Sequence, residues 1–296
     1  MKISHEDLKE FVELQLAAWP LAKKNHDALA QCLRRKFRIG DLDGAFQYNP
    51  ARIRSTGADT SDKGVASRKC FLCSENRPTE QIAVPIEEGW ELLVNPFPIF
   101  PMHFTIASKV HRPQHEIAFE IISMAEKLEG MTVFFNGSKA GASAPDHSHM
   151  QAVLTEELPL MRLIEETHTP DKPGIASASE LGLDLPFDVV SALITPDPSG
   201  MRDIVGMLDP ADGLLNFFAF IGRDGWLRLV RVERTAHRPT CYYSEEPDRL
   251  LVSPGCVDMA GIVITPRKED FDRITVADID RIYRETGKPA HTSPGD

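Results

Sequence analysis

Residues 136–151 constrain this chain more than any other stretch. They start with small, flexible residues and close on His147-x-His149-x-Gln151. In an extended strand, alternate side chains point to one face and lie about 7 Å apart. The spacing therefore predicts two imidazoles and one amide on the same face, directly after a loop of small residues. Such a surface suits a phosphorus centre better than it suits packing against a core.

The pair of histidines has two interpretations. They can be ordinary hydrogen-bonded residues at the edge of a sheet. The nearby Gly141-Ala-Ser143 favours chemistry instead, because its backbone N–H groups and its hydroxyl can bind an anion. A neutral imidazole beside a bound phosphate is a competent nucleophile, which predicts a covalent intermediate and ping-pong kinetics.

Gln151 informs the type of reaction. An amide cannot donate a proton as an imidazolium does, but it can hydrogen-bond a phosphoryl oxygen without activating water. A glutamine at this position therefore favours a transferase or a phosphorylase over a hydrolase.

Cys70-x-x-Cys73 has the spacing of a metal-binding knuckle. Two core thiols are the alternative, and a redox pair is less favoured because no thioredoxin-like βαβ pattern surrounds the motif. Two histidines would complete a tetrahedral zinc site. The candidates downstream are His103, His111, His115 and His147.

The charge balance restricts the partners. The chain of 296 residues has a formal net charge of −11 and contains no long block of Lys and Arg. Sequence-independent binding to nucleic acid or to an anionic membrane normally needs a basic face, so neither partner is expected. Small phosphorylated ligands need only a few local donors and stay compatible with this composition.

The expected compartment is the cytosol, with reduced thiols. The five cysteines are an odd number and do not form a disulfide framework. The sequence also lacks an apolar run of membrane length, and its first residues lack the apolar region of a signal peptide.

The pattern of elements predicts an α+β protein with two halves. Residues 1–45 are expected to form an N-terminal helical arm, with helices over residues 6–19 and 21–35. The first half, residues 46–158, starts with a strand at Phe46, continues through a polar linker at 57–69, and carries the site. Its two strands around a proline-rich connection at 95–101 precede a helix over 116–129 and a buried strand over 131–135.

The second half, residues 159–296, has a similar β-rich make-up. It contains a predicted hairpin with strands over 214–221 and 226–232, turned through residues 223–225. A helix around 276–284 follows near the end. The similarity of the halves is compatible with a distant duplication.

Several segments together resemble the histidine-triad-like nucleotidyltransferases. Phe134-Phe-Asn136, Gly141-Ala-Ser143 and the His-x-His-x-Gln motif resemble the active-site segment of galactose-1-phosphate uridylyltransferases, and Cys70-Phe-Leu-Cys73 resembles their zinc knuckle. Residues 95–106 and 111–114 resemble diadenosine tetraphosphate phosphorylases. Residues 147–152, 258–261 and 266–270 resemble GDP-L-galactose and GDP-D-mannose phosphorylases. The spacer between Ser143 and His147 is one residue longer than in these families.

The resemblance implies a fold of antiparallel sheets with flanking helices and a role for each motif residue. His149 would be the nucleophile that accepts a nucleoside monophosphate, Gln151 would steady the intermediate, and Ser143 would bind the phosphate of the departing or attacking group. The implied nucleotide- and phosphate-binding residues are Asn95, Phe97, Asn136, Gly141 and Ser143. Asn95 would lie near the ribose, with Phe97 against the base.

The resemblance also implies a structural zinc site. Its ligands would be Cys70, Cys73, His111 and His147, with His115 as the alternative to His111. In that role His147 fixes the strand that presents His149. A divalent ion bound with the substrate and a homodimer are both compatible with this group of enzymes.

The implied activity is transfer of a nucleoside monophosphate from a nucleotide sugar or a dinucleoside polyphosphate to phosphate or a sugar phosphate. One alternative is a hydrolase of the same fold. The other is a nucleotide-binding, zinc-stabilised protein without catalysis.

Overall fold

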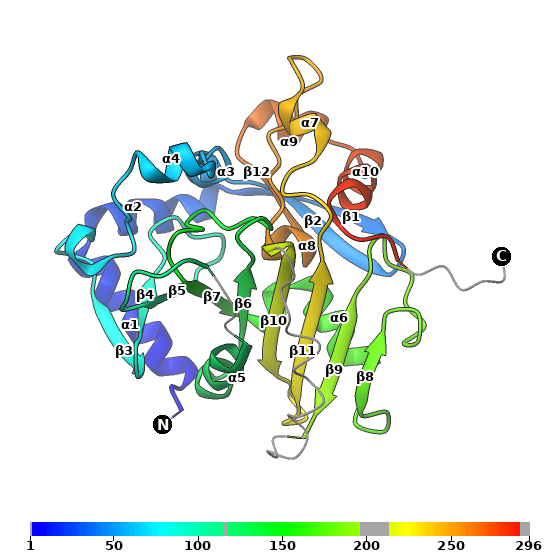
Figure 1. Cartoon of the computed structure of the whole chain (residues 1–296), viewed down its shortest axis with the longest axis horizontal. Helices are drawn as coiled ribbons and strands as arrows, with labels where there is room; N and C mark the ends of the chain where they lie inside the picture. The colour runs from blue at the N-terminus through cyan, green and yellow to red at the C-terminus, as the bar shows by residue number, and fades with distance from the viewer. Residues whose placement is uncertain (1, 115–117, 196–212, 291–296) are drawn as a thin grey trace.

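The computed structural model describes residues 2–114, 118–195 and 213–290. Within these residues the strands form two sheets (Figure 1). The larger is a nine-stranded sheet in the order β3-β4-β5-β7-β6-β10-β11-β9-β8. Its strands are β3 (Ala83–Glu87), β4 (Trp90–Val94), β5 (His103–Ser108), β6 (Met131–Asn136), β7 (His149–Leu154), β8 (Gly174–Ser177), β9 (Val190–Ile194), β10 (Leu215–Ile221) and β11 (Leu227–Glu233).

The nine-stranded sheet repeats one strand order. The first half gives β4-β5-β7-β6 and the second gives β8-β9-β11-β10, so each half exchanges its third and fourth strands. The halves meet where β6 pairs antiparallel with β10, from Asn136↔Asn216 to Thr132↔Phe220. The predicted hairpin is confirmed as β10 and β11. The expected α+β fold of two related halves is therefore confirmed.

A smaller sheet joins the two ends of the sequence. It contains β1 (Leu33–Ile39), β2 (Leu42–Tyr48) and β12 (Ile262–Thr265), with β2 in the centre. The hairpin β1–β2 is antiparallel, whereas β12 runs parallel to β2. The N-terminal segment is thus part of the same body as the C-terminal one.

The prediction of an all-helical arm is wrong after residue 31. The predicted second helix continues past α2 as a 3-10 turn over Ala28–Gln31 but does not reach Arg35, because residues 33–39 form β1. Arg and Lys favour helices, but pairing with β2 and burial of Phe37 decide the conformation here. The strand predicted from Phe46 already begins at Leu42, and the polar loop after it contains short helices.

The helices cover both faces of the large sheet. They are α1 (His5–Ala18), α2 (Pro20–Asp27), α3 (Ile53–Thr56), α4 (Asp62–Ala66), α5 (Ala118–Lys127), α6 (Pro159–Thr167), α7 (Thr240–Tyr243), α8 (Cys256–Met259), α9 (Lys268–Arg273) and α10 (Val276–Thr286). One core packs α1 and α5 against the sheet, and the other packs α6, α8, α10 and the small sheet against the opposite face. The second core includes Val153 of β7. Alternate side chains of a strand point to the same face, so His149 and Gln151 face the same side of the sheet as Val153.

The proline-rich connection between β4 and β5 is held by side chains from the N-terminal segment. The carbonyl oxygens of residues 96, 97, 98 and 99 accept, in turn, hydrogen bonds from Asn25, Arg52, Asn49 and Gln47. The prolines at 96 and 98 lack an N–H, so this segment cannot extend a sheet ladder. Side chains therefore satisfy carbonyls that no neighbouring strand reaches.

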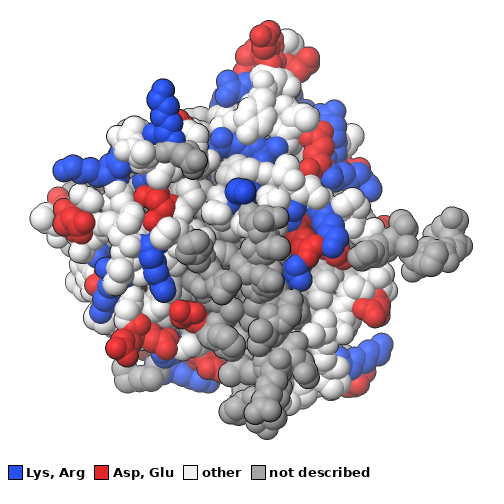
Figure 2. All heavy atoms as spheres, in the orientation of Figure 1, with Lys and Arg blue, Asp and Glu red and all other residues white. Residues whose placement is uncertain are grey.

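Acidic and basic side chains are intermixed on the face of the molecule that Figure 2 shows. Any attraction of a phosphorylated ligand to that surface must therefore come from a few local groups. Among the described residues, no helix has the length and apolar character needed to cross a bilayer.

The loop after β6 is packed against a segment of the second half. Gly141 has a φ of +96°, and a Cβ there would lie 2.5 Å from the Cα of Gly255 and 2.8 Å from the carbonyl oxygen of Pro254. Both observations require glycine. The small residues of this loop thus have a packing reason in addition to any role towards an anion.

Gly141→Ala should destabilise the protein more than Gly89→Ala. Gly89 has a φ of +79° but nothing within 4 Å of a built Cβ, so its substitution costs only the left-handed strain, about 1–2 kcal/mol. Gly141→Ala adds a backbone clash of about 1–3 kcal/mol. Urea unfolding of both variants measures the difference. Equal losses would show that the loop does not pack on Gly255 as described.

Candidate functional site

His149 is the first residue of β7 and is buried. Its Nδ1–H donates to the carbonyl oxygen of His147 at 2.8 Å, which leaves the lone pair on Nε2. Nε2 has no hydrogen-bond partner among the residues that the structure describes. Burial lowers the pKa of His149 to about 4, although the hydrogen bond to His147 acts in the opposite direction. The ring is therefore neutral and can present Nε2 as a nucleophile.

The amide of Gln114 fixes the backbone of His149. Its Oε1 accepts the N–H of His149 at 2.8 Å, and its Nε2 donates to the carbonyls of His149 and Asn136, each at 2.9 Å. Regular pairing between β6 and β7 ends at Phe134↔Gln151. The buried Gln114 side chain thus bridges the two strands where their ladder stops, at the start of the motif.

Gln151 lies two residues further along β7, opposite Thr105 of β5. Its Oε1 lies 2.8 Å from Nε2 of His103, which is fully buried. No partner of its amide nitrogen occurs among the described residues. The alternation predicted from sequence thus holds for His149 and Gln151, whereas His147 lies before the strand.

Asn136 ends β6 and is buried. Its Oδ1 accepts hydrogen bonds from the N–H of Cys256 at 2.7 Å and from Nδ2 of Asn216 at 3.0 Å. Asn216 is the residue opposite it on β10, and its own Oδ1 accepts from the buried Arg234 at 2.7 Å. The side-chain oxygen of Asn136 therefore joins the two halves, which leaves only its Nδ2 for a ligand.

Ser143 is half-buried, and its hydroxyl makes no hydrogen bond within the described part of the chain. Arg68 donates to its carbonyl oxygen at 3.3 Å and forms an ion pair with Asp146 at 2.9 Å. Arg68 also lies over the ring of Phe71 in the Cys70–Cys73 knuckle. The longer spacer between Ser143 and His147 is thus tied to the knuckle through Arg68.

Asn95 and Phe97 lie at the start of the proline-rich connection, and both are half-buried. Asn95 Oδ1 accepts the N–H of Phe97 at 3.0 Å, and its Nδ2 donates to the hydroxyl of Thr105 at 3.2 Å. Thr105 also faces Gln151 across the sheet. This bond places the predicted nucleotide-binding turn beside the strand that carries the motif.

Cys70, Cys73, His111 and His147 form one group, the Cys/His cluster, whose ligand atoms all lie within 4.8 Å of one another. Nδ1 of His147 is 3.3 Å from Sγ of Cys70 and 3.6 Å from Sγ of Cys73. Nδ1 of His111 is 3.2 Å from Sγ of Cys73. The four residues predicted as metal ligands are therefore brought together. His115, the alternative third ligand, lies outside the described residues.

The Cys/His cluster fits a tetrahedral metal ion. Zinc bonds of about 2.3 Å to sulfur and 2.0 Å to nitrogen place those atoms about 3.5 Å apart. The Nε2–H of His147 donates to the carbonyl oxygen of Ser108 at 2.8 Å, so Nδ1 directs its lone pair at the thiols. A ligating histidine is commonly oriented in this way. The donor set and the tautomer of His147 are compatible with a bound metal ion such as zinc.

The sequence did not mark two residues that shape the site. Gln114 ends the segment 111–114 that resembles diadenosine tetraphosphate phosphorylases, but that resemblance gave it no role, and nothing in the predicted loop signals a buried amide. His103 appeared only as a candidate ligand, yet it contacts Gln151 and Ile99 rather than the Cys/His cluster. A histidine within a buried strand was the only available signal.

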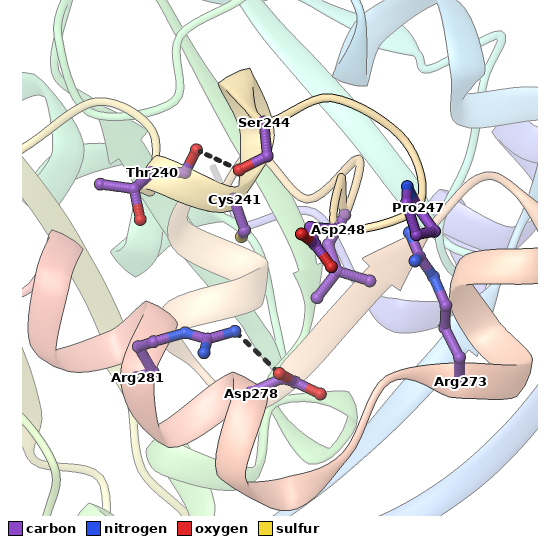
Figure 3. A pocket seen from close by; sticks show the side chains of 9 residues that line it. Thr240, Cys241, Ser244, Pro247, Asp248, Arg273, Asp278 and Arg281 are labelled. Carbon is purple, nitrogen blue, oxygen red and sulfur yellow. Dashed lines mark hydrogen bonds and ion pairs between the residues drawn. The ribbon is translucent and has the colours of Figure 1, made fainter.

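A cavity of about 440 Å³ lies elsewhere, between α7 and α10 (Figure 3). Its charged side chains are largely satisfied by neighbours: Arg281 donates to Asp278 at 2.8 Å, and Arg273 donates to Asp270 at 2.9 Å. None of the predicted site residues lines this cavity.

The fold is similar to that of yeast Ap4A phosphorylase Apa2. The structure of yeast Ap4A phosphorylase Apa2 in complex with Ap4A matches with a TM-score of 0.62 and 14% identity, covering 99% of this chain and 100% of that chain. Its complex with AMP gives a TM-score of 0.59 and 13% identity, covering 98% of each chain. A structure of Apa2 without a named ligand gives a TM-score of 0.54 and 13% identity, covering 93% of this chain and 96% of that chain. At this identity the similarity establishes the fold alone.

At the level of sequence, a family model described as a domain of unknown function, DUF4922, matches residues 11–154. This range includes all the predicted site residues. No curated protein matches the sequence.

Zinc should be present at about one ion per chain, and Cys73→Ser should lose it. Without the ion the fold should lose about 3 kcal/mol, which lowers the melting temperature by roughly 6–12 °C. Metal analysis and thermal unfolding, on protein never exposed to chelators or a nickel column, measure both effects. Cys32→Ser, a thiol outside the Cys/His cluster, is the control. A metal-free wild type that a strong chelator does not destabilise would contradict the zinc site.

Proposed function

We propose that this protein is a nucleotidyltransferase that works through a covalent nucleotidyl-histidine at His149. It moves a nucleoside monophosphate from a dinucleoside polyphosphate or a nucleotide sugar to phosphate or a sugar phosphate. The observation that carries this proposal is the state of His149: it is buried and neutral, and its Nδ1 is bound to a backbone carbonyl, so that Nε2 is unpartnered within the described residues.

The first step forms a bond from Nε2 of His149 to the α-phosphorus of the donor. The bond from that phosphorus to its bridging oxygen breaks, and the leaving group departs with the electron pair as a phosphate oxyanion. The substituted ring carries a positive charge, and the carbonyl of His147 stabilises it through the Nδ1–H bond. Gln151 and Ser143 would hydrogen-bond phosphoryl oxygens of the donor.

The second step reverses the first with a new partner. An ionised oxygen of phosphate or of a sugar phosphate attacks the nucleotidyl group, the P–N bond breaks, and neutral His149 returns. The acceptor brings its own negative charge, so this step requires no general base.

The nucleotide would lie against the turn of Asn95 and Phe97, in the first half of the chain. Arg52, half-buried, donates to the carbonyl oxygen of Phe97 and adds positive charge near this turn. The fold similarity to Apa2, whose structures contain Ap4A and AMP, supports a substrate with a nucleoside monophosphate joined to further phosphates.

Zinc in the Cys/His cluster would act as a structural cross-link. Cys70 and Cys73 precede the strands of the nine-stranded sheet in the sequence, whereas His147 lies two residues before the nucleophile His149. Its carbonyl accepts the Nδ1–H of His149, so fixing His147 also fixes the direction of Nε2.

A nucleotidyl adduct should form on wild type and be absent from His149→Ala. The protein is mixed with a panel of dinucleoside polyphosphates and nucleotide sugars, and denaturing mass spectrometry detects an acid-labile nucleoside monophosphate on His149. The substitution removes the nucleophile, so turnover should fall roughly 10⁴-fold or more.

His168→Ala is the control for loss of a buried histidine, because His168 lies in the second half and binds Ser191 and Lys172. Equal amounts of nucleotidyl adduct on wild type and His149→Ala would contradict the covalent mechanism. Release of free nucleoside monophosphate without any acceptor would favour the hydrolase instead.

A further inference from the structure

We propose that His103 is a positioning residue that holds the Gln151 amide with its N–H donors towards the transferred phosphoryl group, which makes the nucleotidyl-enzyme resistant to water. This inference rests on the proposed function of His149. His103 itself touches no substrate and acts through Gln151. Its effect on Gln151 explains why the acceptor is an ionised phosphate group and not water.

The orientation follows from one backbone group. The N–H of Ile99 donates to Nδ1 of His103 at 3.1 Å, and an N–H can only donate. In a neutral ring Nε2 then carries the proton, and it lies 2.8 Å from Gln151. The partner atom must accept, so it is Oε1, and the amide nitrogen of Gln151 points away from His103.

The ring of His103 stays neutral. It is fully buried, and burial, with a smaller effect from the charge of Arg52, lowers its pKa to about 3. The backbone that orients it is also fixed, because the buried Gln47 donates to the carbonyl of Ile99 at 3.0 Å. His103 therefore has one tautomer and one partner at every working pH.

The consequence for the reaction concerns water. With Oε1 engaged, Gln151 offers only donors, which suit phosphoryl oxygens but cannot accept a proton from water. If the amide rotated, Oε1 would face the phosphoryl group and could orient a water molecule for attack. Phosphate and sugar phosphates need no such acceptor because they arrive ionised.

The test measures how the nucleotidyl-enzyme divides between acceptor and water. The adduct is formed, the donor is removed, and its decay is followed with and without inorganic phosphate. His103→Phe removes both hydrogen bonds and frees Gln151. Its adduct should transfer to phosphate about tenfold more slowly and hydrolyse about tenfold faster than that of wild type.

Two further variants separate positioning from folding. His103→Gln restores a donor and an acceptor and should recover most of the ratio of transfer to hydrolysis. His168→Phe, which also replaces a buried histidine with two hydrogen bonds, should leave the ratio unchanged. An unchanged ratio in folded His103→Phe overturns the proposal. If that variant does not fold, the NMR measurement described below decides the question.

A second measurement needs no turnover. In wild type the imidazole ¹⁵N signals of His103 should show a neutral ring with the proton on Nε2 down to about pH 5. Gln151→Ala should shift that Nε2–H signal and speed its exchange with water. A proton on Nδ1, or no response to Gln151→Ala, overturns the orientation, whereas a wild type without adduct but with these signals overturns only the function of His149.

Discussion

The antiparallel pairing of β6 with β10 is the interaction on which the rest of the structure depends. It turns two halves with the same strand order into one sheet with a packed core on each face. At its end, Asn136 and Asn216 bind each other, and the buried Arg234 satisfies Asn216 and the carbonyl of Pro254. The segment that packs on Gly141 is thereby fixed. The candidate site belongs to the first half by sequence, but residues of the second half contact Asn136 and Gly141.

Backbone groups fix the tautomers and orientations of the histidine side chains in the candidate site. A backbone carbonyl selects the tautomer of His149, and a backbone N–H selects that of His103. The carbonyl of Ser108 does the same for His147 and aims its other nitrogen at the thiols. Three histidines of identical chemistry thus receive two tautomers from the main chain around them: the proton lies on Nδ1 in His149 and on Nε2 in His103 and His147. In each case the partner is a group that can only donate or only accept, so the assignment is unambiguous.

The sequence predicted features that depend on local spacing. The alternation of His149 with Gln151 and the gathering of the four predicted metal ligands both appear in the structure. It missed features that depend on distant pairing. Residues 33–39 have helix-forming side chains, yet a neighbouring strand makes them extended. Gln47 and Gln114 serve carbonyls far along the chain, and no local pattern identifies which carbonyl a buried amide will meet.

The parallel pairing of β12 with β2 has a consequence for how the chain is made. The hairpin of β1 and β2 leaves the ribosome well before its third strand, Ile262–Thr265, because the whole nine-stranded sheet lies between them in the sequence. Until then one edge of β2 has no neighbour, and an open edge invites pairing with other chains. Closure of this sheet over such a long loop is slow because the entropy of the loop must be lost first. The free edge of β2 is therefore a segment that a chaperone would need to shield until β12 has been made.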